Sequence, residues 1–279
     1  MRYLDATFTS MMYAKVVTVQ LINYMGYDCL FQDVDMHWYK NPLEAFHNKT
    51  SPLYDFDILF QDDGARSLRY APYCANSGFY FVRYNDRTRY LFVSLLLHSD
   101  MIVAHGSHQQ VLVSLLTEHA SLTGLKVKVL GHDGYPGGWD YHRHSRWEYL
   151  RKLPSGETIG EIFHMSWTEN KDNKILFMKQ MGMWYLNEDC NSKKLDEILS
   201  LRGGTEITRR LQEETGDLGD VTDQAAVVNA EFSVVNKMDV FNMCCSVEPL
   251  ISCHYRDKPS VIDCSSSPPI DKGGVTFWK

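Results

Sequence analysis

The chain has 279 residues, of which 44% are hydrophobic and 23% are charged, and its formal net charge is −7 at pH 7. This composition is typical of a globular protein, and the acidic balance without a Lys/Arg block argues against nucleic acid as the main partner, because phosphate contacts need a basic surface. No apolar run approaches the roughly 20 residues of a membrane span, and no secretory signal precedes the first helical pattern.

The first predicted elements are a helix and a strand. Residues 5–25 carry apolar side chains at helical spacing, and Gly26 is a typical stop signal. The apolar run 29–31 then indicates a buried strand within residues 27–35.

Two carboxylates, Asp33 and Asp35, follow this apolar run one residue apart. Aspartate is depleted in strands and an unpaired buried charge is costly, so the pair predicts a cation. Mg²⁺-type sites use one or two carboxylates with substrate phosphates, and ligands of open α/β sheets lie outside the carboxyl ends of strands. The pair therefore predicts a metal–diphosphate site, and the alternative is an acidic turn after a strand.

The following elements alternate between strands and helices. The patterns predict strands over residues 57–61, 77–83, 127–130 and 162–166. They predict helices with Asn41-Pro42, Asp86 and Ser107 at their starts, and a last helix over 171–181 that stops at Gly182. This alternation argues for an α/β fold.

The last third of the chain has a different character. Residues 1–186 form the predicted α/β domain, 187–239 a polar helical appendage, and 240–279 a loop-rich tail that contains cysteines. Five of the seven cysteines lie in this last third, namely Cys190, Cys244, Cys245, Cys253 and Cys264. The odd total prevents complete pairing within the chain, and disulfides, free thiols and a zinc site stay open.

The other two cysteines, Cys29 and Cys74, are predicted to be buried or free, because they lie in or near strand-like segments. The sequence 48–50 is a glycosylation sequon, which agrees with disulfides in the secretory pathway.

Three sequence blocks occur in a specific order along the chain. The first is 26–35 followed by Trp38 and Asn41-Pro42, the second is 76–83, and the third is His164 with 171–174. Together they resemble the nucleotide-diphospho-sugar transferases, and in particular glycosyltransferase family 77, which contains plant and algal cell-wall xylosyl- and arabinosyltransferases. The resemblance spans roughly residues 8–186.

The resemblance implies a GT-A-like (Rossmann-like) mixed sheet flanked by helices, with the first amino-terminal strands lacking from this chain. It implies a metal-dependent glycosyltransferase that moves a sugar from a UDP-type donor to a glycan or glycoprotein acceptor, with retention. The sugar would be galactose or a pentose such as xylose or arabinose. Such enzymes act in the Golgi lumen as type II membrane proteins, so the anchor is expected in a longer parent chain.

The resemblance also implies roles for single residues. The expected ligands of Mn²⁺ (or Mg²⁺) are Asp33, Asp35 and His164, and Asp33 could contact the ribose instead. The residues expected at the diphosphate are Lys15 and Lys174, or Lys171, and those expected near the donor sugar as catalytic residues are Asn76 and Gln109. These types suit the reaction, because a divalent cation and lysines stabilise the negative charge of a departing nucleoside diphosphate.

Each of these residues also has a structural alternative. His164 fits a core histidine, Lys15 fits a solvated helix face, and Asn76 fits a turn. The chain also differs from the family at His108, where relatives usually carry aspartate before the glutamine, and at 165–166, where relatives often have asparagines.

Two other functions compete with the transferase. The first is a non-catalytic fragment or pseudoenzyme that keeps the scaffold for glycan or partner binding. The second is an Asp-x-Asp phosphatase, which is disfavoured because that chemistry needs a threonine shortly after the aspartates and this chain has Met36-His37-Trp38.

Overall fold

The structure is a computed structural model, and it describes residues 6–64, 66–141, 160–168, 171–180 and 183–184. All of these except 183–184 belong to one compact unit. The predicted appendage at 187–239 and the predicted tail at 240–279 lie outside the described residues, together with their five cysteines.

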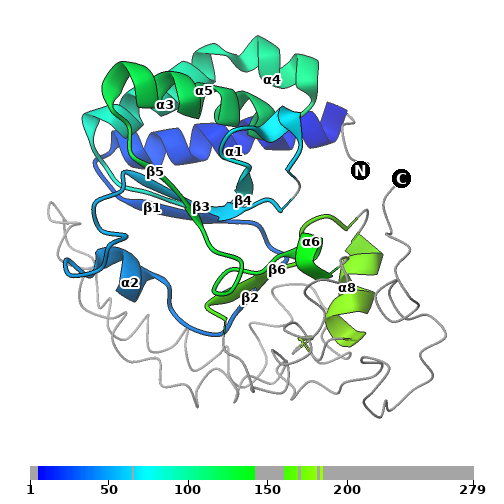
Figure 1. Ribbon diagram of the computed structural model, residues 1–279. Coiled ribbons are helices and arrows are strands. Elements are labelled where there is room, and N and C mark those ends of the chain that lie inside the picture. Colours follow the sequence, from blue (N-terminus) through cyan, green and yellow to red (C-terminus); the bar gives the residue numbers. More distant parts are fainter. Residues whose placement is uncertain (1–5, 65, 142–159, 169–170, 181–182, 185–279) are drawn as a thin grey trace, which may run out of the picture. The chain divides into compact units, whose positions relative to one another are not determined.

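The centre of this unit is a four-stranded mixed sheet in the order β1-β4-β3-β5 (Figure 1). Its strands are β1 (Cys29–Gln32), β3 (Ile58–Asp62), β4 (Ala75–Val82) and β5 (Val127–Leu130). Strand β4 is antiparallel to both β1 and β3, and β5 is parallel to β3. Strands β1, β3 and β5 therefore point the same way, and their carboxyl ends lie at one edge of the sheet.

Helices cover both faces of this sheet (Figure 1). One face carries α1 (Ala6–Tyr24), α3 (Asp86–Leu97), α4 (Ser99–His105) and α5 (His108–Thr123), and the other carries α2 (Leu43–His47). Because side chains alternate along a strand, Ile58 and Phe60 pack into the core on the four-helix face, whereas Leu59 packs with Phe46 of α2 on the other. The predicted mixed sheet flanked by helices is confirmed.

A second sheet, of two strands, lies beside the first and includes a strand from the later part of the chain (Figure 1). In it β2 (Met36–Trp38) pairs antiparallel with β6 (Ile162–His164), and Met36 is opposite His164. Helices α6 (Gly138–Tyr141) and α8 (Lys171–Gln180) accompany these strands. This pairing brings His164 next to the segment that carries Asp33 and Asp35.

Several predicted boundaries need correction. The structure ends β1 at Gln32, so Asp33 and Asp35 lie in the connection to β2, a strand that the sequence patterns did not predict. Helix α4 was not predicted either. The N-cap of α3 is Asn85 rather than Asp86, and the N-cap of α2 is Pro42, with Asn41 Oδ1 accepting a hydrogen bond from Leu43 N at 3.1 Å.

Other predictions agree with the structure. Ser107 caps α5 by accepting a hydrogen bond from Gln109 N, and Cys29 and Cys74 are buried, free thiols. No helix among the described residues is long and apolar enough to cross a membrane. Within the same residues β1 pairs with β4 alone, and the expectation that the chain lacks the first amino-terminal strands of the fold stays a prediction.

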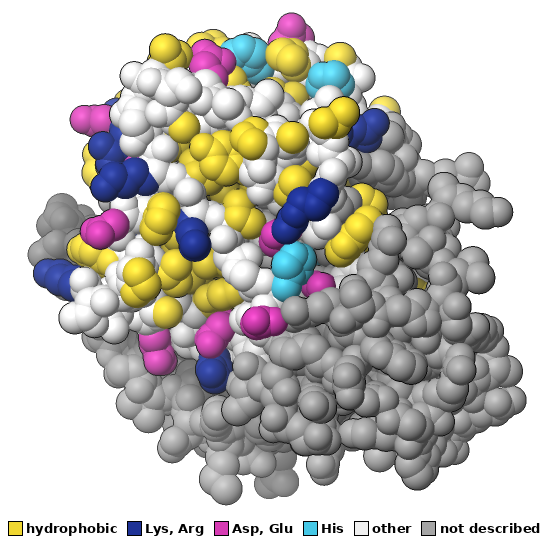
Figure 2. All heavy atoms as spheres, in the orientation of Figure 1, with side chains coloured by type: hydrophobic (Ala, Val, Ile, Leu, Met, Phe, Trp, Pro, Cys, Tyr) yellow, Lys and Arg dark blue, Asp and Glu magenta, His cyan; other side chains and the backbone are white. Residues whose placement is uncertain are grey.

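The surface over α1 and β1 carries a group of hydrophobic side chains (Figure 2). The large exposed residues at the end of α1 and in the turn after it are Leu21, Tyr24, Met25 and Tyr27. The guanidinium of Arg89 lies over the ring of Tyr24, at 5.6 Å from its centroid. Exposed apolar groups of this kind are typical of contact surfaces.

Candidate functional site

The two predicted metal-binding aspartates lie at the edge of the sheet where β1, β3 and β5 end. Asp33 directly follows β1, and its backbone N–H donates to Gly78 O of β4 at 2.7 Å. Val34 between the two aspartates is fully exposed, while Asp35 is half-buried. Both carboxylates therefore lie where ligands of open α/β sheets bind.

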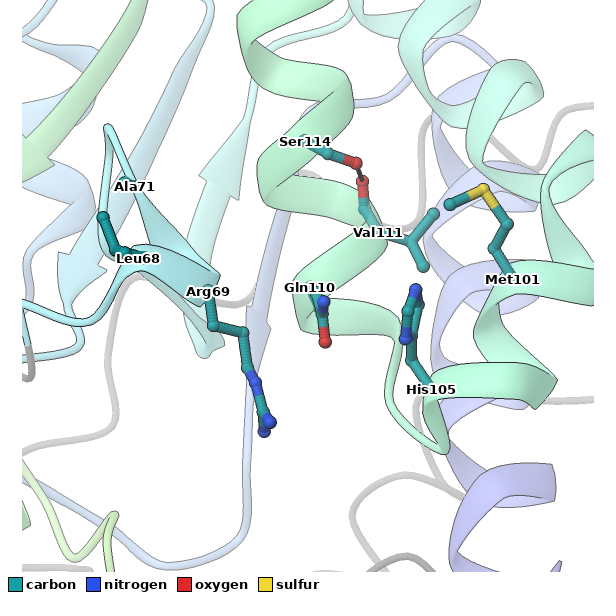
Figure 3. Close-up of a pocket in the computed structure, with 8 residues that line it drawn as sticks. All are labelled: Leu68, Arg69, Ala71, Met101, His105, Gln110, Val111 and Ser114. Atoms are coloured by element: carbon teal, nitrogen blue, oxygen red, sulfur yellow. Dashed lines mark hydrogen bonds between the residues drawn. The ribbon is translucent and has the colours of Figure 1, made fainter.

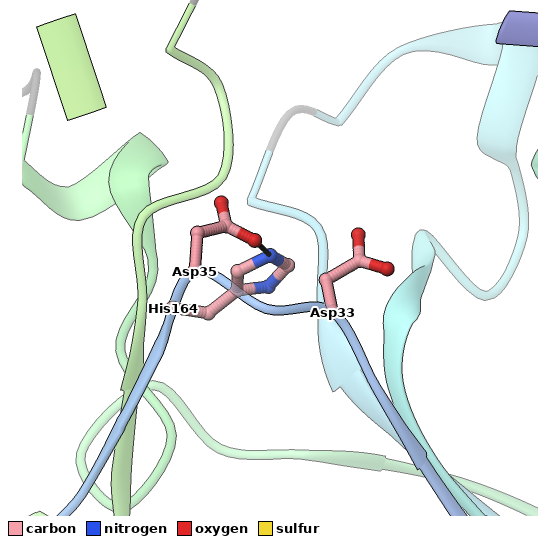
Figure 4. Close-up of side chains that lie close together, drawn as sticks. All are labelled: Asp33, Asp35 and His164. Atoms are coloured by element: carbon pink, nitrogen blue, oxygen red, sulfur yellow. Dashed lines mark ion pairs between the residues drawn. The ribbon is translucent and has the colours of Figure 1, made fainter. Parts of the chain in front are cut away.

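His164 completes a group of three side chains that are close enough to share one ion. One ligand atom from each of Asp33, Asp35 and His164 lies within 4.8 Å of the others. Figure 4 shows the three side chains, with His164 Nε2 at 3.5 Å from Asp35 Oδ1. The histidine comes from β6, which reaches this place because β6 pairs with β2 immediately after Asp35. The structure thus brings together all three predicted ligands.

Two lysines neutralise these aspartates. Lys15 Nζ of α1 donates to Asp33 Oδ1 at 2.5 Å, and Lys174 Nζ of α8 donates to Asp35 Oδ2 at 2.5 Å. Burial by itself would raise the pKa of Asp35, but the charges and hydrogen bonds of His164 and Lys174 hold it well below its ordinary value. Asp35 is therefore ionised at neutral pH.

The donor set of this group suits a divalent cation. Carboxylate oxygens are preferred by Mg²⁺ and Mn²⁺, and imidazole joins them at sites for transition metals. Two carboxylates and one imidazole leave further coordination positions for the oxygens of a bound phosphate. The residues present therefore fit the cation that the sequence predicts.

The two predicted catalytic residues, Asn76 and Gln109, both contact a third residue that the sequence reading missed. Asp63 is buried, with 3% of its surface exposed. Its Oδ1 accepts hydrogen bonds from Asn76 Nδ2 at 2.9 Å and from Gln109 Nε2 at 3.0 Å. Gln109 Oε1 accepts in turn from the Ser77 hydroxyl at 2.9 Å. Asn76 and Gln109 thus belong to one hydrogen-bonded group at the end of β3.

A comparison with known protein families gives one match for this chain. Residues 2–178, which are more than half of the chain, match the family described as nucleotide-diphospho-sugar transferase. The chain belongs to this transferase family. No curated protein and no solved structure matches significantly. Membership confirms the coarser part of the resemblance, a transferase that uses a nucleotide-sugar donor and an acceptor, whereas membership of family 77 stays a prediction.

The pKa of the buried Asp63 carboxyl differs from that of an ordinary aspartate. Burial raises the pKa of Asp63 to about 6, although the hydrogen bonds from Gln109 and Asn76 favour its ionised form. Its second oxygen, Oδ2, is buried and has no hydrogen-bond partner among the described residues. A buried acceptor of this kind can take a hydrogen bond from a hydroxyl group of a ligand.

Replacing Asp63 by asparagine is expected to stabilise the protein at neutral pH but not in acid. The pKa of Asp63 is raised from 3.8 to about 6 in the folded chain, so the protonated carboxyl stabilises the folded chain relative to the ionised one. This stabilisation is complete below pH 3.8 and is lost as the pH rises through 3.8 to above about 6. Asparagine mimics the protonated form at every pH. The stability advantage of Asp63→Asn should therefore grow by about 2 kcal/mol between pH of about 4 and about 7, measured by urea unfolding.

The matched control is Asp86→Asn, because the side chain of Asp86 is fully exposed. Because an exposed ion pair such as the one between Asp86 and Arg89 contributes little to stability, any pH-dependent gain of Asp86→Asn should be much smaller than that of Asp63→Asn. A difference between Asp63→Asn and wild type that does not change with pH would contradict the raised pKa of Asp63.

A second group of charged residues fixes the loop between β5 and α6. His132 lies between two carboxylates, with Nδ1 at 2.9 Å from Asp140 Oδ2 and Nε2 at 3.3 Å from Asp62 Oδ2. The hydrogen bonds with Asp140 and Asp62 raise the pKa of His132 to about 9, so its ring is a cation at neutral pH. Arg66 also binds both oxygens of Asp62, at 2.5 and 2.6 Å. This cluster joins the loop to the end of β3.

The remaining predicted residues lie farther from the ligands. Lys171, at the start of α8, is exposed and makes no ion pair with Asp33 or Asp35, so the structure brings Lys174 rather than Lys171 to the carboxylates. His108, at the position where the resemblance implies aspartate, is buried with 1% exposed surface. Burial and the charge of Lys15 lower the pKa of His108 to about 3, so its ring is neutral at neutral pH.

A separate groove of about 250 Å³ lies between the short 3₁₀ helix η1 (Leu68–Tyr70), α4 and the first half of α5. Figure 3 shows side chains that line the groove, among them Arg69 of η1, His105 of α4 and Gln110 of α5. None of the three candidate metal ligands lines it. The groove is therefore a different feature of the surface from the aspartate–histidine site.

Proposed function

We propose that the chain is a metal-dependent glycosyltransferase that moves a sugar from a UDP-type donor to a glycan or glycoprotein acceptor, with retention. The observation that carries the proposal is the convergence of Asp33, Asp35 and His164, with their ligand atoms within 4.8 Å, at the carboxyl edge of the sheet. Family membership supports the donor class, and the resemblance to family 77 supports xylose, arabinose or galactose as the sugar.

In this proposal Asp33, Asp35 and His164 hold Mn²⁺ or Mg²⁺. The bound cation supplies Lewis-acid stabilisation of the negative charge that develops on the departing diphosphate. Lys15 and Lys174 add two further positive charges at the same place, because each already lies at 2.5 Å from a site carboxylate. Both lysines are half-buried, which strengthens their interaction with an anion compared with a fully solvated lysine.

The group around Asp63 is proposed to orient the donor sugar. Asn76 and Gln109 bind one oxygen of Asp63 and leave the other without a partner among the described residues. This free oxygen can accept a hydrogen bond from a sugar hydroxyl, and the bond would recover part of the cost of burying the carboxylate. In this role Asp63 sets the sugar position, and Asn76 and Gln109 set the position of Asp63.

Thermal unfolding with UDP and Mn²⁺ tests the proposed site. UDP with Mn²⁺ at about 100 times the dissociation constant should stabilise the wild-type chain by roughly 2.7 kcal/mol, and omission of Mn²⁺ should remove most of this gain. Asp35→Asn should lose the response, because it removes the carboxylate that faces both His164 and Lys174. Asp86→Asn, an exposed replacement of the same type, should keep it.

Sugar transfer separates the enzyme from the alternative, a scaffold that binds without catalysis. A wild-type response to UDP and Mn²⁺ together with transfer from UDP-xylose, UDP-arabinose or UDP-galactose would support the enzyme. A response without transfer from any donor would favour the non-catalytic alternative. No response in the folded wild-type chain would overturn the metal–diphosphate site itself.

A further inference from the structure

Gln61, the fourth residue of β3, connects His164 with the loop before α6. Its side chain is fully buried. Gln61 Nε2 lies at 3.0 Å from Tyr135 O and at 3.0 Å from Pro136 O, while Gln61 Oε1 lies at 2.7 Å from His164 Nδ1. One glutamine amide therefore contacts two backbone carbonyls and one imidazole nitrogen.

These contacts determine which way the amide of Gln61 points. A backbone carbonyl oxygen can only accept a hydrogen bond, so the group that faces Tyr135 O and Pro136 O must be the NH₂ donor. The reverse orientation would place Gln61 Oε1 against two carbonyl oxygens in a buried place, with no hydrogen bond to offset the repulsion. The acceptor Oε1 is consequently the atom that faces His164.

The orientation of Gln61 in turn determines where the hydrogen of a neutral His164 ring lies. Because Oε1 can only accept, His164 Nδ1 must carry the hydrogen. The lone pair of the neutral ring is then on Nε2, the nitrogen that lies at 3.5 Å from Asp35 Oδ1. A histidine binds a metal through a nitrogen without hydrogen, and the partner of the other nitrogen selects the tautomer.

We infer that Gln61 is a positioning residue, which holds His164 in the tautomer with Nε2 free to bind a divalent cation together with Asp33 and Asp35. This inference rests on the proposed metal site, but the tautomer can be observed without any metal. Gln61 does not bind the cation itself in this inference and acts on it only through the His164 ring.

The backbone around His164 is fixed to the same loop. His164 N donates to Pro136 O at 3.2 Å, so Pro136 O accepts from the backbone of His164 and from the side chain of Gln61. Gly137 forms a parallel β-bridge with His164. The loop that carries Gly137 is also held to β3 by the ion pair between His132 and Asp62. These contacts hold the backbone of His164. The hydrogen bond between His164 Nδ1 and Gln61 Oε1 then restricts the rotation of the imidazole ring.

The first measurement is the tautomer of His164 in the metal-free wild-type chain. Nuclear magnetic resonance of protein labelled with ¹⁵N-histidine correlates each ring nitrogen with the ring C–H groups and identifies the nitrogen that carries hydrogen. His164→Gln assigns the signals by their loss. At a pH where the signals stop moving and the ring is neutral, hydrogen on Nδ1 is expected. Hydrogen on Nε2 would overturn the inference.

The second measurement uses Gln61→Met, which keeps the volume of the side chain and removes the acceptor. We expect mixed tautomers of His164 and a loss of Mn²⁺ affinity of about 10- to 100-fold, measured by calorimetry. The matched control is Gln20→Met, because Gln20 is also buried but lies on α1 away from His164. An unchanged tautomer in folded Gln61→Met would overturn the inference.

The two proposals can fail separately. If His164 carries hydrogen on Nδ1 and the wild-type chain binds neither Mn²⁺ nor Mg²⁺, the result supports the assignment of Gln61 and overturns the metal site. If the chain binds Mn²⁺ while neutral His164 carries hydrogen on Nε2, the metal site stands and the role of Gln61 is wrong. The wild-type measurement decides the role of Gln61 even if Gln61→Met fails to fold.

Discussion

Replacement of Gly78 by alanine is expected to lower Mn²⁺ affinity by at least about tenfold and to leave the chain folded. A Cβ atom at Gly78 would lie 2.5 Å from His164 Cε1 and 2.8 Å from Asp33 Oδ2, well inside ordinary contact distances. Both neighbours are candidate ligands, so one methyl group would push two of the three ligands apart. Calorimetric titration with Mn²⁺ and thermal unfolding without metal measure the two effects.

The position of Gly78 follows from an irregularity in the sheet. The register between β3 and β4 shifts between Phe60 and Gln61, and the unpaired stretch of β4 turns Gly78 towards the site. Gly78 O also accepts the backbone N–H of Asp33 at 2.7 Å, so a shift of β4 away from the added methyl group would cost this hydrogen bond. Overpacking of this kind typically costs about 1–3 kcal/mol of stability, which a folded chain can tolerate.

Gly131→Ala is the matched control for this substitution. Gly131 lies in the loop after β5 at the same edge of the sheet, and a Cβ atom there would have no neighbour within 4 Å. This variant should bind Mn²⁺ as the wild type does. Unchanged Mn²⁺ affinity in Gly78→Ala would show that the cation does not lie between Asp33 and His164.

The elements that could be predicted from sequence are those with strong local signals. Strand β5 was predicted with its observed bounds, and α5 with its Ser107 cap, because an apolar pattern and a capping side chain lie within a few residues. Helix α4 was missed because it is short and no side chain caps its start, although Gly106, with φ +67°, ends it in the usual way. Strand β2 was missed because it has only three residues and because its partner β6 is distant in the sequence.

The N-cap of α3 shows how a tertiary contact decides between two neighbouring candidates. Asn85 and Asp86 are both good capping residues by type. Asn85 takes the position, and its Oδ1 accepts from Arg87 N at 3.0 Å and Thr88 N at 3.1 Å. Its Nδ2 donates to the buried Asp57 at 2.9 Å. A carboxylate at that position could not donate to Asp57, and this reason is invisible in the local pattern.

The candidate site was predictable in its ligands but not in its supporting residues. Asp33, Asp35 and His164 were predicted from motif order, and the structure brings them together. Asp63 and Gln61 were missed, because nothing local separates the Gln-Asp-Asp sequence at 61–63 from an ordinary polar turn. Their roles arise from contacts with Gln109 and His164, which lie far away in the chain.

Replacement of Lys15 by methionine is expected to change two affinities in opposite directions. Lys15 binds one oxygen of Asp33 and Lys174 binds one oxygen of Asp35, so both ammonium groups compete with a divalent cation for the negative charge of these carboxylates. Removing one competitor should raise the affinity for Mn²⁺ alone by about tenfold, since a hydrogen bond to a charged group contributes roughly 1.5–3 kcal/mol. The same change should lower UDP affinity in the presence of Mn²⁺ by about tenfold, because methionine cannot replace the ammonium group that would bind the diphosphate.

Opposite signs distinguish this exchange from general damage to the site, which would weaken both ligands. Lys174→Met should behave as Lys15→Met does, because its ammonium lies at the same 2.5 Å from a carboxylate. Lys171→Met is the comparison on the same helix, and its affinity for Mn²⁺ alone should match the wild type, since Lys171 is exposed and pairs with neither aspartate. Titration calorimetry with Mn²⁺ alone, and then with UDP at saturating Mn²⁺, gives both values. A fall in Mn²⁺ affinity in Lys15→Met and Lys174→Met would mean that the lysines support the cation and do not compete with it.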